Sequence, residues 1–250
     1  MSKDTADVVV IGGGVVGAAI AFELARAGCR DVILLEKGFL ACGSTGRCGA
    51  GVRQQWGTVT NCTLARESVR IFETMDDYLD YTPGVEFRQG GYLILAYTDK
   101  QWEQFRRNVE LQRSLGIEVE MLSPAEARGI VPYLNTEGLV GATFCRKDGH
   151  ANPFHVTLAY ARAAARLGVD IRTRTEVTGI DVKAGRIRSV HTSKGTIHTS
   201  TVMNCAGPYA GVVAAMAGLQ LPLWAERHQI LVTEPVEPIQ DPMVISFHHR

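Results

Sequence analysis

Three glycines and one acid near the amino terminus carry the clearest chemical signal in the sequence. Gly12, Gly14 and Gly17 have the spacing Gly-x-Gly-x-x-Gly, and Glu36 follows 19 residues after Gly17. In dinucleotide-binding units such glycines allow a tight turn, close approach of a pyrophosphate and helix–strand packing, while the acid accepts ribose hydroxyls. An acid at this place favours an unphosphorylated ribose, and therefore FAD or NAD over NADP.

The residues around this motif predict the βαβ unit that would position it. Residues 8–11 are all apolar, which is typical of a parallel strand buried on both faces. A helix is expected over roughly 14–28, and a second strand over 31–35 ends on Glu36. A phosphate would lie at the helix N-terminus, where free N–H groups and the helix dipole favour an anion. Lys37 follows as either a neighbour of the adenine or a solvated lysine at the strand end.

Two later segments are expected to contact the same ligand. Residues 38–57 form a long, glycine-rich segment with few hydrophilic spacers, which suits a backbone lying against a ligand. The expected strand at 201–205 ends on Ala-Gly-Pro-Tyr at 206–209, and another helix begins there. This second strand–glycine–helix junction could bring a further helix N-terminus to the cofactor.

The composition limits the class of protein. The 250 residues can form one large domain or two intimate ones, and the 26 basic and 26 acidic residues give no sign of nucleic acid as a partner. The six cysteines include no Cys-x-x-Cys pair, so no metal site is predicted, and thiols in a cytoplasmic protein are the simplest explanation. Charged residues and glycines interrupt the apolar stretch 8–28, so we expect no transmembrane segment and no export signal.

The middle of the chain differs in character from its beginning. Residues 86–88 and 92–96, joined through two glycines, predict an antiparallel strand pair. Asp99 is expected to cap one helix, and Ser123 begins another through a capping box. Residues 85–145 are therefore expected to form an inserted α+β unit.

The rest of the chain alternates helices and short strands. After residue 152 a capped, alanine-rich helix is expected over 153–167, followed by a strand over 169–172. Further strands are expected at five places, of which the first three form an antiparallel meander: 177–182, 186–191, 196–198, 230–233 and 243–247.

Four segments in this order resemble one family. They are residues 8–17, the loop 43–57, the segment 148–164 that begins Asp-Gly-His-Ala-Asn-Pro, and Met-Asn-Cys-Ala-Gly-Pro-Tyr-Ala at 203–210. The chain resembles the FAD-dependent amine and amino-acid oxidoreductases of the D-amino-acid oxidase type. Within that group it is most similar to glycine and sarcosine oxidases, the sarcosine oxidase β subunit and the dye-linked proline dehydrogenase β subunit.

The resemblance implies the fold class and the reaction. We expect an α/β protein in which a discontinuous FAD-binding Rossmann-type domain (1–84 and 146–218) is interleaved with an α+β substrate domain on a mixed sheet. The substrate domain (85–145 and 219–250) is expected to be incomplete, because family members continue further. The implied reaction moves a hydride equivalent from the carbon next to an amine to the flavin.

The resemblance and the glycine motif together give a set of candidate FAD contacts. Polar side chains and N–H groups of the loop after Glu36 would meet phosphate or flavin oxygens, and a later strand would meet the adenine. Besides the three glycines, Glu36 and Lys37, the candidates are Val15, Val16, Gly43, Ser44, Thr45, Gly51, Val177, Ala206 and Gly207.

The resemblance also implies residues for the substrate. Arg53 lies before Trp56 where relatives place the arginine that binds the substrate carboxylate; the alternative is an arginine paired with a surface acid. Arg47 and His228 are weaker candidates, and His228 is otherwise an ordinary strand histidine.

The sequence leaves three hypotheses about the function open. The first is an oxidoreductase for a small amine or amino acid, alone, as a homo-oligomer or with a partner subunit. The second is an inactive fragment that binds FAD or ADP. A nicotinamide-dependent dehydrogenase fits the first motif but not the later segments.

Overall fold

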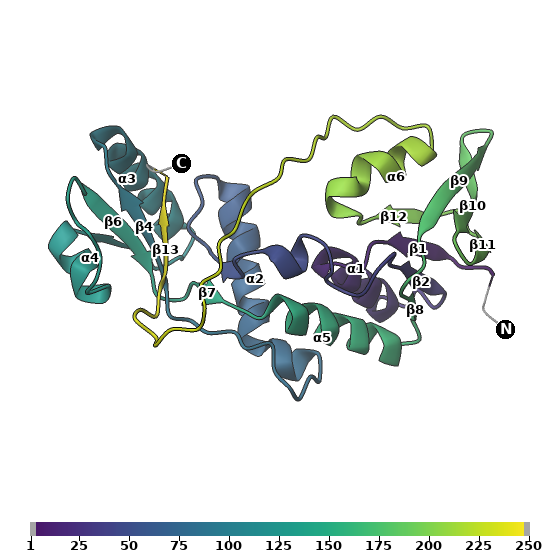
Figure 1. The fold of residues 1–250 in the computed structure, drawn as a ribbon, viewed down its shortest axis with the longest axis horizontal. Helices are drawn as coiled ribbons and strands as arrows, with labels where there is room; N and C mark the ends of the chain where they lie inside the picture. The colour runs from purple at the N-terminus through teal and green to yellow at the C-terminus, as the bar shows by residue number, and fades with distance from the viewer. Residues whose placement is uncertain (1–3, 248–250) are drawn as a thin grey trace. The chain divides into compact units, whose positions relative to one another are not determined.

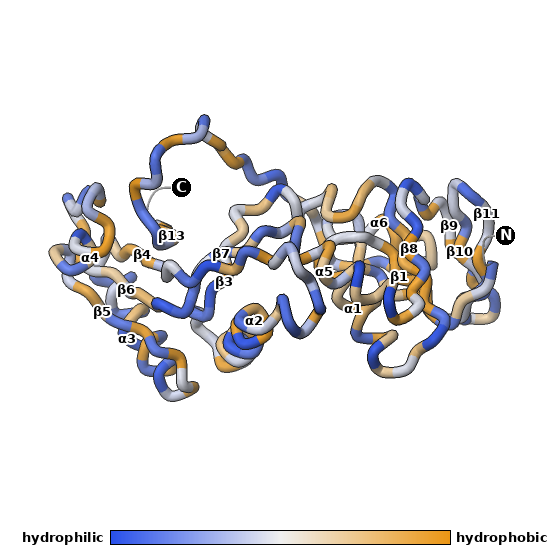
Figure 2. The backbone as a smooth tube through the Cα atoms, turned by 90° about the horizontal axis from the view of Figure 1, so that it is seen from below, coloured by the Kyte–Doolittle hydropathy of each residue, from blue (hydrophilic) through white to orange (hydrophobic). Residues whose placement is uncertain are grey.

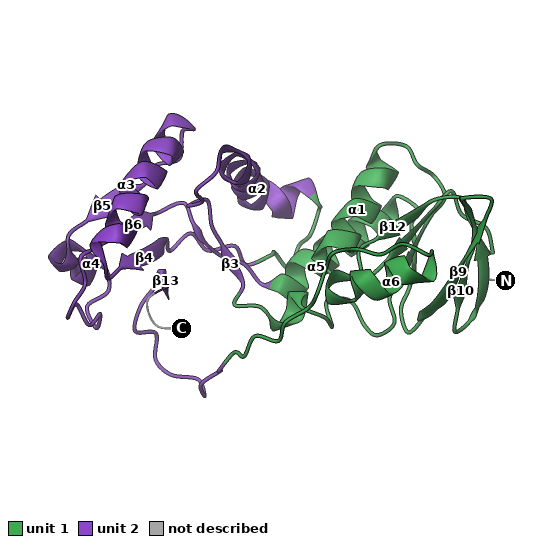
Figure 3. Cartoon of the chain, turned by 90° about the horizontal axis from the view of Figure 1, so that it is seen from above, with its two compact units in different colours: residues 1–49, 79–85, 153–230 green, residues 50–78, 86–152, 231–250 purple. Residues whose placement is uncertain are grey.

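The chain folds as two units, each built from three separate segments, in a computed structural model that describes residues 4–247 (Figure 3). Unit 1 comprises residues 1–49, 79–85 and 153–230, and unit 2 comprises residues 50–78, 86–152 and 231–250. These units are compact bodies. The assignment of segments to an FAD-binding and a substrate domain stays a prediction.

A parallel sheet of four strands forms the centre of unit 1 (Figure 1). Its order is β12-β1-β2-β8, with β1 at Val8–Ile11, β2 at Val32–Leu35, β8 at Asp170–Arg172 and β12 at Val202–Asn204. Every residue of β1 and β2 is buried, as a continuous apolar run predicts for strands covered on both faces. Hydrophobic colour gathers around β1 in Figure 2.

Two helices pack together beside this sheet. Helix α1 (Val15–Arg26) contacts β1 and β2, and helix α5 (Pro153–Arg166) packs against α1. The ring centroids of Phe22 and Tyr160 lie 5.8 Å apart between the two helices. The many alanines of α5 are mostly buried, which allows the two helix backbones to approach closely.

The expected meander is present and packs against the sheet. Strands β9 (Val177–Lys183), β10 (Arg186–Thr192) and β11 (Gly195–His198) pair antiparallel in sequence order. Their apolar side chains form one core cluster with alternate residues of β1 and β2 and with Val213 of helix α6 (Ala210–Met216). A 3₁₀ turn, η2 (Gly207–Tyr209), separates β12 from α6, so the second junction is less direct than predicted.

Unit 2 contains the predicted mixed sheet. Its order is β13-β4-β6-β5, in which β13 (Met243–Ser246) is parallel to β4 (Tyr92–Ala96). Strands β6 (Gly141–Cys145) and β5 (Glu120–Leu122) continue the sheet in antiparallel pairing. The helices of unit 2 and a separate two-stranded pair are α2 (Val59–Tyr78), α3 (Asp99–Ser114), α4 (Pro124–Ile130), and β3 (Gly51–Val52) with β7 (Gly149–His150).

Three local expectations in this part were wrong. Residues 86–88 do not pair with β4; Arg88 instead bridges to His150, and the Gly91 N–H donates to the Asp148 carbonyl. The expected strand at 230–233 has an irregular backbone, and all four of its residues are exposed. Thr98, not Asp99, caps α3, because the Thr98 hydroxyl accepts from the Gln101 N–H. The capping box at Ser123 is confirmed.

The fold class is confirmed: an α/β protein with a Rossmann-type parallel sheet, together with an α+β unit on a mixed sheet. Among residues 4–247, no helix combines the length and the apolar character that crossing a membrane requires.

We predict that Gly17→Ala destabilises the protein. A Cβ atom there would lie 1.9 Å from the Gly12 carbonyl oxygen, and a backbone atom cannot move aside as a flexible side chain can. The expected loss is about 3 kcal/mol, the upper end of typical overpacking costs, measured by urea unfolding. Gly129→Ala is the control, because a Cβ at that helical position meets nothing within 4 Å. Equal stability of the two variants would contradict the prediction.

Candidate functional site

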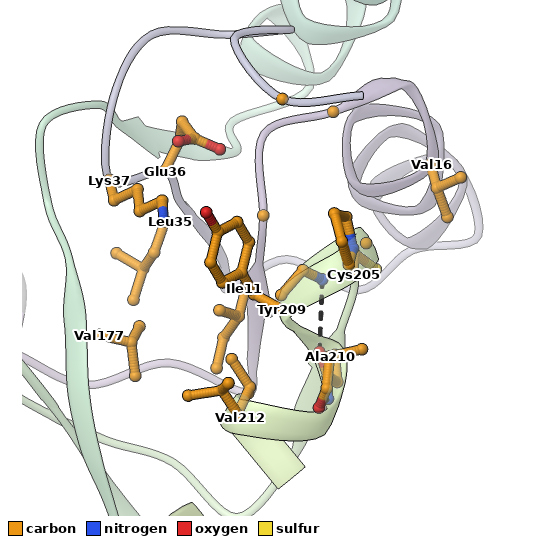
Figure 4. Close-up of a pocket in the computed structure, with 18 of the residues that line it drawn as sticks. Ile11, Val16, Leu35, Glu36, Lys37, Val177, Cys205, Tyr209, Ala210 and Val212 are labelled. Atoms are coloured by element: carbon orange, nitrogen blue, oxygen red, sulfur yellow. Dashed lines mark hydrogen bonds between the residues drawn. The ribbon is translucent and has the colours of Figure 1, made fainter. Parts of the chain in front are cut away.

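A cavity of about 510 Å³ opens in unit 1 at the carboxyl ends of β1, β2 and β12 (Figure 4). Ile11, Leu35 and Asn204, which end these three strands, all contribute to its lining. Open parallel sheets bind ligands at this edge, where the loops and the helix N-termini converge. The sheet topology therefore brings the glycine turn, the strand-end acid and the second junction to one place.

The glycine turn is closely packed. Gly12 has a φ of +117°, and a Cβ atom there would lie 2.3 Å from the Cys205 carbonyl oxygen. The α1 N-terminus that follows has no side-chain cap from Gly14 and no acid in its first turn. The Thr45 hydroxyl accepts from the Val15 N–H at 3.2 Å. The turn thus offers N–H groups and a hydroxyl to an anion, with no negative side chain nearby in the helix.

Glu36 is held by its own neighbours. One carboxylate oxygen accepts from the Gly13 N–H at 2.7 Å, and the other accepts from the Gly38 N–H at 2.7 Å. The Cys42 thiol donates to the second oxygen at 3.4 Å. The residue is only 8% exposed, yet it lines the cavity. Because each carboxylate oxygen has more than one lone pair, Glu36 can fix the turn and still accept ligand hydroxyls.

Lys37 is not a freely solvated lysine. Its ammonium lies 3.6 Å from the centroid of the Tyr209 ring, and both residues line the cavity (Figure 4). This cation–π contact joins the end of β2 to the junction after β12. The two sides of the cavity are therefore connected by side chains as well as by the sheet.

Most of the predicted cofactor contacts meet in this cavity. The lining includes Gly12, Gly14, Val16, Glu36, Lys37, Gly43, Ser44, Thr45, Val177, Ala206 and Gly207. Val15 and Gly17 are not in the lining: Val15 contributes the N–H described above, and Gly17 packs on Gly12. Gly51 lies in unit 2, where a Cβ would meet the Tyr92 hydroxyl at 2.7 Å, so its described role is packing.

Sequence reasoning missed several lining residues. Tyr209 stood within the Ala-Gly-Pro-Tyr motif, but an aromatic residue in a motif does not reveal a partner across the cavity. The other missed residues are Ile11, Leu35, Cys42, Thr175, Glu176, Asn204, Cys205, Pro208, Ala210, Val212, Val213 and Met216. They belong to strand ends, loops, η2 and α6, and these elements meet at the cavity only through the tertiary fold.

Arg53 lies in unit 2, in a short loop after β3. Its guanidinium carbon is 4.2 Å from the Trp56 ring centroid and 5.7 Å from that of Tyr92. The Trp56 indole N–H donates to the Arg53 carbonyl at 2.9 Å. Among residues 4–247, no acid lies within ion-pair distance of Arg53, so the alternative of a surface ion pair is not observed.

The other two substrate candidates, Arg47 and His228, belong to unit 1 and do not line its cavity. Arg47 is exposed in the 3₁₀ turn η1 (Thr45–Arg47) and does not line the cavity. His228 is exposed in an irregular segment, so it is not the strand histidine that the sequence allowed.

A buried carboxylate lies behind the Arg53 loop. Asp148 is 0% exposed and accepts from the Gln54 N–H at 2.9 Å and from the Gln54 and Gln55 side-chain amides at 3.2 and 3.1 Å. Burial raises the pKa of Asp148, although these hydrogen bonds oppose the rise. Burial also raises the pKa of Tyr92, and the charge of Arg53 opposes that rise.

The cavity fits the adenosine diphosphate part of a dinucleotide. It offers glycines that allow close approach, a helix N-terminus with no acid in its first turn for the pyrophosphate and a fixed acid for the ribose. Within the described residues, no group of three or more His, Cys, Asp or Glu residues is arranged to hold a metal ion.

Comparison with known proteins agrees with this geometry. Residues 7–249 match the family described as FAD dependent oxidoreductase. The chain is 34% identical to sarcosine oxidase subunit beta from Arthrobacter sp., over 98% of this chain and 62% of that protein. Among solved structures, it is similar to L-proline dehydrogenase from P. horikoshii, with 35% identity and a TM-score of 0.87, covering 98% of this chain and 65% of that one. Glycine oxidase from Geobacillus kaustophilus gives 27% identity and a TM-score of 0.83, covering 98% of this chain and 67% of that one.

The chain therefore belongs to the FAD dependent oxidoreductase family, and FAD is the cofactor of that family. This confirms the resemblance stated from the sequence. The chain spans about three fifths of the length of the sarcosine oxidase subunit that it matches.

We predict a pH dependence of stability from Asp148. Because its pKa is raised in the folded state, the folded chain holds this proton more tightly than the unfolded chain does. Its contribution to stability is therefore present below the usual pKa of 3.8 and is lost as the pH rises through the raised folded value.

Asp148→Asn removes this titration. Urea unfolding of both proteins across this pH range should show wild-type stability falling relative to the variant as the pH rises. Parallel stability curves, or a wild-type curve that rises relative to the variant, would contradict the raised pKa.

Proposed function

We propose that this chain is the FAD-binding, substrate-oxidising part of an oxidoreductase that acts on a small amine or amino acid. The observation that carries the proposal is the cavity in which the glycine turn, Glu36 and the junction after β12 meet. The similar proteins are named for sarcosine, proline and glycine, so we propose a substrate of that size, with an amine next to a carboxylate.

The residues of unit 1 would hold the cofactor in a defined order. The α1 N-terminus and the Thr45 hydroxyl would hold the pyrophosphate, and Glu36 would accept the ribose hydroxyls. Lys37 and Val177 would flank the adenine, and Ala206 with Gly207 would lie beside the flavin. When bound, the flavin supplies the acceptor for a hydride equivalent from the carbon next to the amine.

Arg53 is proposed to bind the substrate carboxylate. A guanidinium can donate two parallel hydrogen bonds to a carboxylate, which fixes both the position and the direction of the ligand. The Trp56 and Tyr92 rings beside Arg53 restrict its side chain without neutralising its charge. Arg47 and His228 remain weaker candidates for substrate binding, because both are exposed and neither lines the cavity.

The electron acceptor distinguishes two forms of the proposed enzyme. An oxidase would pass electrons to oxygen and release hydrogen peroxide, whereas a dehydrogenase subunit would reduce a dye or a partner. One similar protein is named as a subunit, which supports a partner subunit for this chain as well. We also propose a cytoplasmic location for the protein.

A second candidate is a protein that binds FAD or ADP without catalysis. It is favoured by the completeness of the cavity for the adenosine half of the cofactor within unit 1. Such a protein would depend on Glu36 as strongly as an enzyme does, but it would have no need for Arg53. The two predictions that follow therefore separate the candidates.

Glu36→Gln should weaken binding of FAD and of ADP. The amide replaces one acceptor oxygen, so either the Gly13 or the Gly38 N–H faces a second donor, and the charge-assisted bonds to the ribose are lost. A loss of about 1.5–3 kcal/mol corresponds to roughly 10–150-fold in Kd, measured by calorimetry with ADP. Glu23→Gln on α1 is the control, because Glu23 forms an exposed ion pair with Arg26 and does not line the cavity. Unchanged ADP affinity in Glu36→Gln would remove Glu36 from the site.

Arg53→Ala should lower kcat/KM for carboxylated amines by roughly 2–4 kcal/mol equivalent, without loss of flavin. The physical reason is the loss of the bidentate contact with the carboxylate. Arg106→Ala is the matched control, since Arg106 also lies over a tryptophan ring, that of Trp102, in the same unit. Steady-state kinetics with sarcosine, proline and glycine measure the effect, and an unchanged kcat/KM would exclude Arg53 from substrate binding.

A further inference from the structure

A hydrogen-bond network that the proposed function does not yet use lies behind the Arg53 loop, entirely within unit 2. Its centre is the fully buried Asp148, and its other members Gln54 and Gln55 are 4% and 6% exposed. These two glutamines directly follow Arg53 in the sequence. The network therefore fixes the residues that adjoin the proposed substrate arginine.

Each hydrogen bond of the Gln55 side chain has a defined direction. The Gln55 amide nitrogen donates to Asp148 at 3.1 Å and to the Tyr92 carbonyl at 2.8 Å, while its oxygen accepts from the Thr143 hydroxyl at 2.8 Å. Both acceptors on the nitrogen side can only accept, so this amide cannot be reversed. Asp148 also accepts from the Gln54 backbone, which fixes the chain as well as the side chain.

The backbone next to the network carries Arg53 and its aromatic neighbour. The Trp56 carbonyl accepts from the Gln112 amide at 2.8 Å and from the Cys62 thiol at 3.2 Å. The Trp56 indole then donates to the Arg53 carbonyl, and the Arg53 guanidinium lies over the same ring. Hydrogen bonds therefore fix the loop 53–56 both at Gln54 and at Trp56. The positions of these two residues determine where the Arg53 guanidinium lies.

A carboxylate is a costly residue to bury here. No cation pairs with Asp148 within residues 4–247, and its donors are amides together with the Cys145 thiol. Desolvation of a charge that lacks an opposite charge costs several kcal/mol. Only a carboxylate has two oxygens that both accept, so only it satisfies the Gln54 N–H groups on one oxygen and the Gln55 amide on the other.

We propose that Asp148 is a positioning residue, which fixes the loop 53–56 so that Arg53 meets a substrate carboxylate in one orientation. The proposal rests on the proposed function, because it takes Arg53 as the carboxylate ligand. Asp148 itself touches neither substrate nor cofactor in this account. It acts through Gln54 and Gln55, whose donors it holds.

The test is a comparison of Asp148→Asn, Arg53→Ala and the double variant in the flavin-loaded protein. The probe is methoxyacetate, the oxygen isostere of sarcosine, which carries the carboxylate but no amine to oxidise. Methoxyacetamide, its neutral analogue, reports binding that does not depend on the carboxylate. Calorimetry gives both dissociation constants, and thermal unfolding confirms that each variant is folded at the temperature of the titration.

The expected result is a roughly tenfold weaker affinity of Asp148→Asn for methoxyacetate, with no change for methoxyacetamide or flavin content. Arg53→Ala should weaken methoxyacetate further, and the double variant should match Arg53→Ala alone. A purely stabilising role of Asp148 predicts a lower Tm with unchanged affinity, or effects of the two substitutions that add. Either result overturns the proposal.

A further variant covers a failure of Asp148→Asn to fold, and the results for Arg53→Ala separate a failure of the positioning role from a failure of the proposed function. If Asp148→Asn does not fold, Thr143→Val removes only the Gln55 oxygen's partner and should weaken methoxyacetate about two- to threefold; an unchanged affinity overturns the inference. If Arg53→Ala binds methoxyacetate as wild type does, the assignment of Arg53 in the proposed function fails as well. If Arg53→Ala loses binding but Asp148→Asn does not, only the positioning role fails.

Discussion

The close contact between the glycine turn and its surroundings is the constraint on which unit 1 depends. Side chains at Gly12 and Gly17 would collide with backbone atoms of Cys205 and of Gly12 itself. Their absence lets α1 begin directly at the end of β1 and lets the end of β12 lie against the turn. The helix N-terminus, Glu36 and the junction at 204–207 can face one cavity only because this contact is so close.

Each unit contains a buried carboxylate that holds a loop by its backbone N–H groups. In unit 1, Glu36 accepts hydrogen bonds from the N–H groups of Gly13 and Gly38. The residue proposed to bind the ribose therefore also fixes the glycine turn. In unit 2, Asp148 binds the Gln54 N–H beside the proposed substrate arginine. Charge-assisted hydrogen bonds of this kind are stronger than neutral ones, and they give well-defined positions to loops that carry binding groups.

The sequence predicted what depends on local pattern. The apolar run of β1, the glycine spacing and the capping box at Ser123 have local physical causes, and the structure confirms the corresponding elements. It failed where pairing partners are distant. Residues 86–88 meet His150 and not β4, and the Asp148 network joins residues about 90 positions apart, which periodicity does not reveal. Asp148 stood inside a segment that carried the family resemblance, but nothing local marked it as a partner of Gln54 and Gln55.

The most direct measurement of the central claim is the visible spectrum of the purified protein during anaerobic addition of sarcosine, proline or glycine. We predict an oxidised flavin spectrum that loses its absorbance with at least one of these carboxylated amines and keeps it with a carboxylate-free amine such as dimethylamine. A protein that binds no flavin even after reconstitution, or a bound flavin that none of the three reduces, would contradict the account.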